Sequence, residues 1–306
     1  MRIILIGQAA FAEKTLEKLL DKGEEVLAVF CPPDASGGKL DPVKQRALQL
    51  GIPVHQHKTL KAPEVREQFA ALQADLAILA FVTQIVPPAV FNTPRLGSIC
   101  FHPSLLPRYR GGSAINWTLI KGETKTGVSW FWVDEGIDTG PLLIQQEATI
   151  DPDDTSGTLY FSKLFPLGIE AIGEAVDLIR AGNPPRIVQD ESQATYDPLC
   201  RDEHARIDWS RPAQEVYNLI RGCDPQPGAY STWQGKMVRF YDCRLQHDVG
   251  TAPPGEVIEI DKESLSVAVP GGKIVVKRMR GEGGKVAAAE VAGQVGLQVG
   301  VQFGQS

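Results

Sequence analysis

The sequence predicts an α/β fold in which helices cover both faces of a mainly parallel sheet, followed by a small antiparallel β-barrel or sandwich. In the first 150 residues, short apolar runs typical of strands alternate with stretches that carry apolar residues at helical spacing. Nearer the C-terminus, short strand candidates separated by turn signals follow one another within about 80 residues. A chain of 306 residues has room for about two such domains.

The alternation in the first part predicts both strands and helices, in order along the chain. We expect strands over residues 2–7, 25–30, 52–54, 76–80, 97–101 and 126–133. We expect helices over residues 14–20, 43–50, 63–72 and 113–120. Because ligands of parallel sheets bind at the carboxyl ends of the strands, residues that directly follow a strand are the first candidates for a site.

The second part begins with a longer amphipathic stretch, 156–181, which predicts a helix that ends where Gly and Pro residues follow at 182–185. A polar segment, 188–205, has few periodic apolar residues and predicts a linker. Further elements are expected as a helix over 212–221 and strands over 237–241, 256–260, 265–269 and 273–278. The predicted domains are therefore 1–187 and 206–306, joined by the linker 188–205.

Composition and charge exclude several classes of protein. The net charge is -6, and the residues from His204 onward are close to neutral, with 12 basic and 11 acidic side chains. Such a chain is a poor non-specific binder of nucleic acid, and we expect no DNA partner. No apolar run approaches the roughly 18 to 20 residues of a membrane span. The five cysteines are scattered and form no CxxC pair, which favours a reducing compartment, and we expect a cytoplasmic protein without membrane contact.

Two polar side chains form the candidate site. His102 follows the apolar run 98–101 and begins a loop rich in Pro and Arg, and Asp138 follows 36 residues later in a loop marked by Gly136 and Gly140. A histidine and a carboxylate brought together in this way can act as the acid/base pair of an acyl-transfer site. Taken alone, His102 is more often a core residue and Asp138 a turn residue.

Other sites have weaker support in the sequence. Residues 134–138 resemble a calcium loop but lack its later bidentate Glu, and only Gly7 of a dinucleotide fingerprint follows the first strand. The histidines of 55–57 are expected in an exposed turn without further metal ligands. No Gly-x-Ser-x-Gly motif is present, because residues 111–115 fail at the last position. We therefore expect no metal site, no NAD site and no serine-hydrolase site.

The sequence from His102 to Gly112, His-Pro-Ser-Leu-Leu-Pro-Arg-Tyr-Arg-Gly-Gly, together with Asp138-Thr139-Gly140, resembles the formyltransferases that use 10-formyltetrahydrofolate. Further matches lie at 189–196, 207–209, 220–222 and 227–229, so the resemblance covers nearly the whole chain. It implies a Rossmann-like catalytic domain, a small OB-like β-barrel domain, 10-formyltetrahydrofolate as formyl donor and tetrahydrofolate as product.

Two branches of this family are similar to the chain. Methionyl-tRNA formyltransferases share both domains and the motif at 189–196. The hydrolase domain of 10-formyltetrahydrofolate dehydrogenase is closer at 113–120 and 164–166. The family has an Asn two residues before the histidine, and this chain has Cys100 at that position. The hydrolase domain of the dehydrogenase is similar in lacking the Asn. A thiol is only a weak hydrogen-bond donor, so this departure puts transfer to an amine in doubt.

The resemblance also implies roles for residues of the site. His102 would donate a hydrogen bond to the formyl oxygen and later act as acid toward N10 of the folate. Asp138 would keep His102 charged and accept the proton of the nucleophile. The residues expected to bind the folate are Gln84, Ile85, Val86, Ser104, Leu105, Leu106, Pro107 and Asp138.

The acceptor of the formyl group stays open at this point. Water is favoured by Cys100, and initiator methionyl-tRNA or a small amine such as an amino-sugar nucleotide are the alternatives. For tRNA, basic residues between Lys273 and Lys285 could gather on one face, although the near-neutral C-terminal part weakens that case. A silent folate- or RNA-binding protein on the same scaffold is the alternative from another class.

Overall fold

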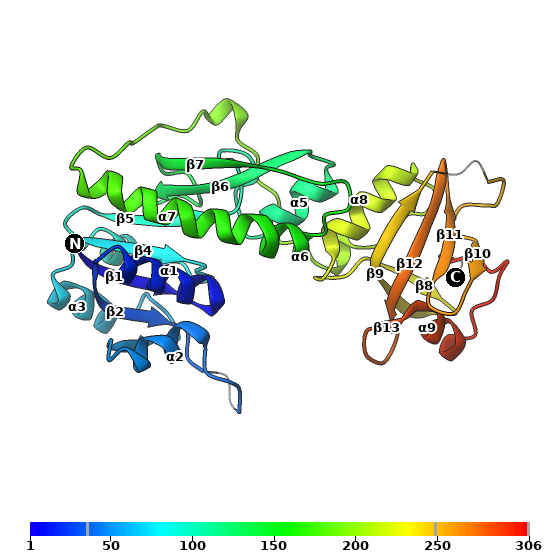
Figure 1. Ribbon diagram of the computed structural model, residues 1–306, viewed down its shortest axis with the longest axis horizontal. Helices are drawn as coiled ribbons and strands as arrows, with labels where there is room; N and C mark the ends of the chain where they lie inside the picture. Colours follow the sequence, from blue (N-terminus) through cyan, green and yellow to red (C-terminus); the bar gives the residue numbers. More distant parts are fainter. Residues whose placement is uncertain (35–36, 248–249, 305–306) are drawn as a thin grey trace. The chain divides into compact units, whose positions relative to one another are not determined.

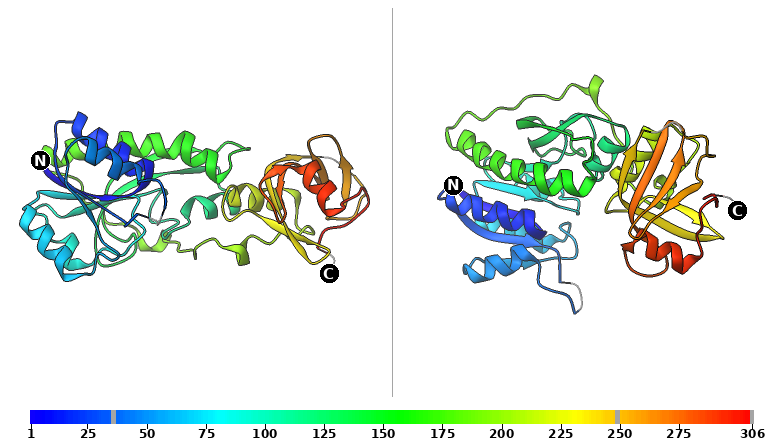
Figure 2. Two further views of the ribbon diagram at one scale, coloured as in Figure 1. Left: turned by 90° about the horizontal axis from the view of Figure 1, so that it is seen from below. Right: turned by 45° about the vertical axis from the view of Figure 1, so that its right-hand side comes forward.

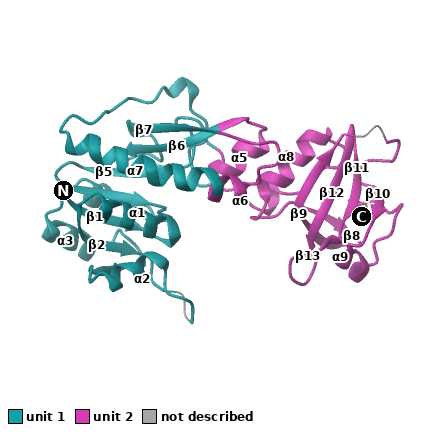
Figure 3. Cartoon of the chain, viewed as in Figure 1, with its two compact units in different colours: residues 1–112, 126–148, 162–196 teal, residues 113–125, 149–161, 197–306 magenta. Residues whose placement is uncertain are grey.

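The computed structural model describes residues 1–34, 37–247 and 250–304. The chain forms two compact units (Figure 3). Unit 1 comprises residues 1–112, 126–148 and 162–196, and unit 2 comprises residues 113–125, 149–161 and 197–306. Within the described residues, no helix is long and apolar enough to cross a membrane.

Unit 1 is built on a seven-stranded sheet with the order β3-β2-β1-β4-β5-β6-β7 (Figure 1). Strands β1 to β5 pair in parallel, and β6 runs antiparallel to β5. This arrangement confirms the predicted α/β fold with a mainly parallel sheet. The strands are β1 (Arg2–Gly7), β2 (Glu25–Cys31), β3 (Val54–Gln56), β4 (Leu76–Ala80), β5 (Ser98–His102), β6 (Lys125–Trp132) and β7 (Leu142–Thr149).

Helices cover both faces of this sheet because each presents an apolar stripe to it. The helices along this part of the chain are α1 (Ala9–Asp21), α2 (Pro42–Gln49), α3 (Pro63–Leu72), α4 (Pro88–Phe91) and α7 (Phe165–Arg180). On one face, Phe11 of α1 contacts Phe101 of β5 and Phe165 of α7. On the other face, Phe69 of α3 contacts Phe30 of β2. The left view of Figure 2 shows α1 and α7, in blue and green, on the same side of the sheet.

A close approach of β1 and β4 explains the glycine that ends β1. A Cβ atom on Gly7 would lie 2.2 Å from the carbonyl oxygen of Ala80 and 2.7 Å from the Cβ of Ala12. Both distances are shorter than van der Waals contact, so only glycine fits where β1 turns into α1. Gly7 is therefore needed for packing at the turn from β1 into α1.

Several local predictions differ from the structure, among them the strand expected over 52–54, which lies at Val54–Gln56 as β3. The stretch 156–181 is not one helix, because α6 (Ser156–Leu159) and a π-helical turn (Tyr160–Leu164) precede α7. Strand β7 was not expected, because most of its side chains alternate between half-buried and exposed and several of them are polar. His55 and Gln56 belong to β3 and not to a turn, and the His55 ring stacks on Phe30 at 4.7 Å between centroids.

Unit 2 contains a curled antiparallel sheet with the order β10-β11-β12-β9-β8, with β13 beside β12. Its sheet and the helix α8 enclose a core that includes Trp209, Phe240 and Phe303 in mutual ring contact. The antiparallel second sheet confirms the predicted small β domain. Its strands are β8 (Tyr230–Trp233), β9 (Lys236–Gln246), β10 (Val257–Ile260), β11 (Leu265–Val269), β12 (Gly272–Arg280) and β13 (Val286–Ala287). The helices of unit 2 include α5 (Ala114–Ile120), α8 (Ala213–Cys223) and α9 (Ala288–Val295), and a 3-10 turn lies at Asp202–His204. A second 3-10 turn, Glu191–Gln193, belongs to unit 1.

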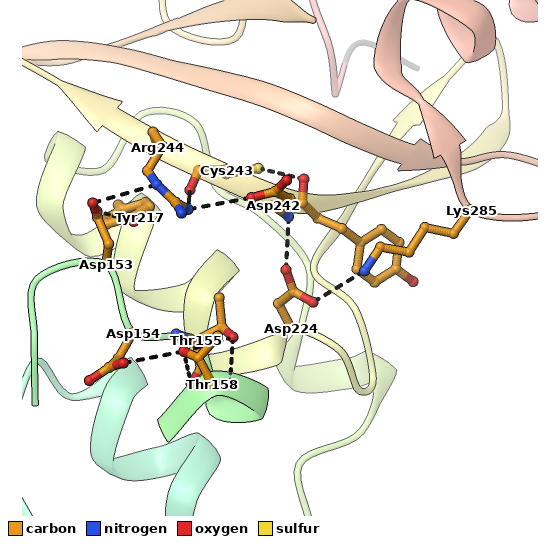
Figure 4. Close-up of polar contacts among 11 residues, drawn as sticks. Asp153, Asp154, Thr155, Thr158, Tyr217, Asp224, Asp242, Cys243, Arg244 and Lys285 are labelled. Carbon is orange, nitrogen blue, oxygen red and sulfur yellow. Dashed lines mark hydrogen bonds and ion pairs between the residues drawn. The ribbon is translucent and has the colours of Figure 1, made fainter. Parts of the chain in front are cut away.

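Hydrogen bonds and ion pairs connect the segment 149–161 and the end of α8 to strand β9 within unit 2 (Figure 4). The hydroxyl of Tyr217 donates a hydrogen bond to Asp153 at 2.7 Å. The buried carboxylate of Asp224 accepts from the backbone N–H of Asp242 at 2.8 Å and faces Lys285 at 3.5 Å. Because Asp224 is buried, these partners offset the cost of removing its charge from water.

Candidate functional site

His102 is the last residue of β5 and is 5% exposed. Its strand lies between β4 and β6, so the side chain is delivered to the carboxyl end of the sheet. The ring Nε2 is 2.7 Å from the carbonyl oxygen of Tyr109. A carbonyl oxygen can only accept, so Nε2 carries the hydrogen of this bond. The contact fixes the ring and leaves Nδ1 as the nitrogen that faces the rest of the site.

Asp138 lies in the loop between β6 and β7, and its Oδ2 is 3.4 Å from Nδ1 of His102. The same oxygen accepts a hydrogen bond from the backbone N–H of Gly111 at 2.8 Å. The structure thus brings together the two residues that the sequence singled out, across 36 residues of chain. The separation is longer than a normal charge-assisted hydrogen bond, a geometry common in catalytic pairs without bound substrate.

The backbone of the Asp138 loop is constrained at several points. Asp138 has a φ of 57°, in the left-handed region that non-glycine residues enter at a cost. Asp134 accepts hydrogen bonds from the N–H of Gly136 at 3.1 Å and from the hydroxyl of Thr139 at 2.6 Å. A Cβ on Gly140 would lie 1.7 Å from the carbonyl oxygen of Trp132, so glycine is required there. These constraints hold the Asp138 carboxylate toward His102.

Cys100 lies two residues before His102 on β5, and side chains two apart on a strand point to the same face. Its thiol donates to the carbonyl oxygen of Phe101 at 3.5 Å. Burial, reinforced by the nearby charge of Asp138, raises the pKa of this thiol well above its usual value. Cys100 is therefore a neutral thiol at physiological pH, and it is neither a nucleophilic thiolate nor a strong donor.

The predicted folate residues of the segment 104–107 are largely engaged inside unit 1. The hydroxyl of Ser104 donates to the carbonyl oxygen of Arg108 at 2.7 Å. The N–H of Leu106 donates to the hydroxyl of Ser129 at 3.3 Å, and its carbonyl accepts from Gln145 at 3.0 Å. Leu105 and Pro107 are half-buried. Any contact of Ser104 or Leu106 with a ligand must therefore add to bonds that these groups already make.

A small open pocket lies at the carboxyl ends of β1, β2 and β4. Of the predicted folate residues, Gln84 lines this pocket. The buried Oε1 of Gln84 has no hydrogen-bond partner among the described residues. Ile85 is 68% exposed and Val86 is half-buried, and neither lines the pocket. The full lining is Ile6, Gly7, Gln8, Phe30, Cys31, Pro32, His57, Leu60, Phe81, Val82, Thr83 and Gln84.

Three polar residues around the site were not predicted from the sequence. The buried amide of Gln189 donates to the carbonyl oxygens of Asp138 at 2.9 Å and Gly140 at 2.7 Å. The guanidinium of Arg110 donates to Gln189 at 2.8 Å and to Glu191 at 2.6 Å. The match at 189–196 contained Gln189 and Glu191, but nothing in the sequence indicated that this polar segment returns to the Asp138 loop.

Across residues 1–34, 37–247 and 250–304, no three His, Cys, Asp or Glu side chains are grouped so that they could bind a metal ion. The polar groups around His102 instead pair with one another and with backbone carbonyls.

Comparisons with known proteins match both parts of the chain to one family. The family described as Formyl transferase matches residues 1–167, and its C-terminal domain matches residues 200–294. The chain belongs to the formyl transferase family. The first of these matches includes both His102 and Asp138.

Curated relatives fall in two branches of the formyl transferase family. The cytosolic 10-formyltetrahydrofolate dehydrogenase of Xenopus laevis is 40% identical over 301 residues, which are 94% of this chain and 33% of the relative. The methionyl-tRNA formyltransferase of Geotalea uraniireducens is 42% identical over 290 residues, which are 93% of this chain and 92% of the relative. The chain thus spans about a third of the length of the dehydrogenases and nearly all of the length of this formyltransferase.

A solved structure agrees with the formyl transferase fold. HypX from Aquifex aeolicus, in complex with tetrahydrofolic acid, superposes with a TM-score of 0.73 at 20% identity. The superposition covers 100% of this chain and 51% of that chain. At this level of identity the likeness concerns the fold.

Proposed function

We propose that the chain moves the formyl group of 10-formyltetrahydrofolate to an acceptor and releases tetrahydrofolate. The observation that carries the proposal is the pair of buried His102 and half-buried Asp138, 3.4 Å apart at the carboxyl end of β5. Such a pair can hold and move protons where a nucleophile meets an acyl carbon. The formyl group of the donor supplies that acyl carbon, bonded to nitrogen.

The pocket beside Gln84 supports a folate donor. A pterin ring is flat and carries N–H donors along its edge, and Gln84 offers a buried acceptor oxygen that has no partner among the described residues. The pocket also lies where open α/β sheets bind ligands. Gln84 would accept from the ring edge, while apolar side chains such as Val82 would contact its face. Ile85, Val86 and residues 104–107 stay predicted contacts.

His102 and Asp138 would divide the proton chemistry. Tyr109 holds the Nε2 hydrogen, so the Nδ1 hydrogen of the charged ring is the one available to the formyl oxygen, where negative charge develops. This hydrogen lies in the plane of the fixed ring, and because its contact with Asp138 is long, it can also be donated to a formyl oxygen bound beside Asp138. Asp138 would accept the proton of the nucleophile, and His102 would pass a proton to N10 as the bond between carbon and N10 breaks.

Cys100 favours water as the acceptor. A neutral thiol bonded to a backbone carbonyl adds little to the stabilisation of the formyl oxygen, whereas an amide N–H at this position would add a donor. With water as the nucleophile, one proton goes to Asp138, one reaches N10 through His102, and the products are formate and tetrahydrofolate. The resemblance of residues 113–120 and 164–166 to the hydrolase domain of 10-formyltetrahydrofolate dehydrogenase supports this choice, and a relative of that name matches the chain over a third of its own length.

Initiator methionyl-tRNA is the second candidate acceptor. It is supported by the methionyl-tRNA formyltransferase relative, which this chain matches over 92% of the relative's length. An amino-sugar nucleotide and a silent folate- or RNA-binding role are further alternatives. We also propose that the domains divide at 187 and 206, and that the protein acts in the cytoplasm, where its five free cysteines stay reduced.

The deciding experiment offers the protein one donor and three acceptors. The protein is incubated with 10-formyltetrahydrofolate in water alone, with initiator methionyl-tRNA, or with an amino-sugar nucleotide, and formate, formyl-methionyl-tRNA and formylated sugar are measured. We expect formate in all three reactions. A rate of tetrahydrofolate release that equals the blank without protein, whichever acceptor is present, would overturn the proposed function.

A further inference from the structure

We infer that Gln189 is a positioning residue that sets the Asp138 carboxylate against His102 through two hydrogen bonds to the Asp138 loop. The inference rests on the proposed function and deepens it, because it names a residue outside the His102 and Asp138 loops on which the chemistry depends. All the residues concerned belong to unit 1.

The amide of Gln189 donates hydrogen bonds to the backbone carbonyls of the residues before and after Thr139. Its Nε2 donates to the carbonyl oxygens of Asp138 at 2.9 Å and Gly140 at 2.7 Å, so both amide hydrogens are used. The side chain is buried, and Gln189 is 6% exposed. Removing these donors would leave the carbonyls of Asp138 and Gly140 without this partner, and the backbone of Asp138 is already in the left-handed region.

The orientation of the amide is fixed from its other end. The Gln189 oxygen accepts from Nη2 of Arg110 at 2.8 Å and from Nε at 3.3 Å. Arg110 in turn pairs with Glu191 through two hydrogen bonds, at 2.6 and 2.9 Å. Because a guanidinium can only donate, the oxygen of Gln189 must face Arg110 and its NH₂ must face the loop.

The segment that carries Gln189 is itself anchored beside the histidine loop. The N–H of Tyr109 donates to the hydroxyl of Thr195 at 2.7 Å, and the N–H of Arg110 donates to the carbonyl oxygen of Thr195 at 3.0 Å. Tyr109 is also the residue whose carbonyl holds His102. The segment 189–195 therefore connects the loop that fixes His102 to the loop that fixes Asp138.

This geometry makes the amide group itself the critical feature. In a Gln189→Glu variant the carboxylate keeps its contact with Arg110 but turns two donors into acceptors that face carbonyls. A Gln189→Met variant has similar volume, no charge and no donor. Gln193→Ala is the matched control, because Gln193 lies in the same segment, is exposed, and makes one long hydrogen bond of 3.5 Å to Ser192.

The kinetic test compares kcat and KM with 10-formyltetrahydrofolate. We expect kcat to fall about 10- to 100-fold in both Gln189 variants, as for displaced catalytic groups, while KM for the folate stays within about threefold. Gln193→Ala should match the parent protein. Thermal melts identify the folded variants. Unchanged kcat in folded Gln189→Glu and Gln189→Met, or a loss confined to KM, would overturn the inference.

A spectroscopic readout separates this inference from the proposed function. The ring protons of His102, assigned by NMR with a His102→Ala variant, report the position of Asp138 without turnover. We expect the His102 signals to shift in both Gln189 variants and to stay in place in Gln193→Ala. If the parent protein lacks formyl release but the signals shift, the proposed function fails and the positioning stands. Unshifted signals in both Gln189 variants would overturn the positioning whatever the activity.

Discussion

Replacing Asp138 by Asn removes the negative charge of the site and keeps the shape of the side chain. Asn tolerates the left-handed backbone at this position better than most residues, and its Oδ1 can still accept from the N–H of Gly111. The hydrogen bonds from Gln189 go to backbone carbonyls and are unchanged. The variant should therefore fold, and its defect should lie in the chemistry.

The size of the defect follows from the distance between the two groups. Two opposite unit charges 3.4 Å apart, as in protonated His102 and Asp138, attract by about 5 kcal/mol at an effective dielectric constant of about 20. At 1.36 kcal/mol per factor of ten, this corresponds to at most about three to four orders of magnitude in rate. Loss of a general base lowers the rate by about 10²- to 10⁴-fold, which is a similar range. We expect kcat/KM of Asp138→Asn to fall within this range.

The assay follows the appearance of tetrahydrofolate from 10-formyltetrahydrofolate, with folding checked by thermal melts. Glu135→Gln is the matched control, because it makes the same change of charge at an exposed position of the same loop. We expect this control to retain the parent rate. A folded Asp138→Asn variant with kcat/KM within about threefold of the parent protein would refute the assignment of proton transfer to Asp138.

Three further perturbations have defined outcomes. Cys100→Asn should raise the rate of formyl transfer to an amine about 10- to 10³-fold by adding an amide donor, measured against Cys100→Ser; an equal rate in both would contradict this. The hydrogen bond from Arg110 lowers the pKa of Glu191, so the stabilising contact is present above the ordinary Glu value of about 4.3 and is lost as pH falls through the lowered pKa. The difference in Tm between the parent protein and Glu191→Gln should therefore narrow in acid, and a constant difference would contradict it. Tyr217→Phe removes the bond to Asp153 shown in Figure 4 and should cost about 1 kcal/mol, or a Tm decrease of about 2 to 4 °C, with unchanged kinetics.

The sequence predicted the fold best where one physical signal dominated. Strands such as β1 and β4 are buried on both faces, so their apolar runs were visible along the chain. Strand β7 was missed because its exposed side carries Gln and Glu residues that dilute the pattern. The helix expected over 156–181 is interrupted by a π-helical turn ahead of Pro166, a local change of hydrogen bonding that apolar spacing does not reveal.

In the site, too, residues marked by their local sequence could be predicted, whereas a residue placed there only by the fold could not. The pairing of His102 and Asp138 could be predicted because each is marked by its own loop chemistry. Gln189 could not, because it is a polar residue in a segment without periodicity, and its burial arises only when that segment returns to the Asp138 loop.

In the proposed reaction, the arrangement around β5 separates the residues that transfer protons from the residue that favours one acceptor over another. His102 and Asp138 are held by main-chain groups of Tyr109 and Gly111, so their geometry does not depend on the residue at position 100. Cys100 makes its own contact with Phe101 and leaves that framework intact. In the proposed mechanism, a change at this position alters how well the formyl oxygen is stabilised, and hence which nucleophiles react at a useful rate, without altering proton transfer. The choice between water and an amine should respond to Cys100→Asn, whereas loss of Asp138 should slow both reactions together.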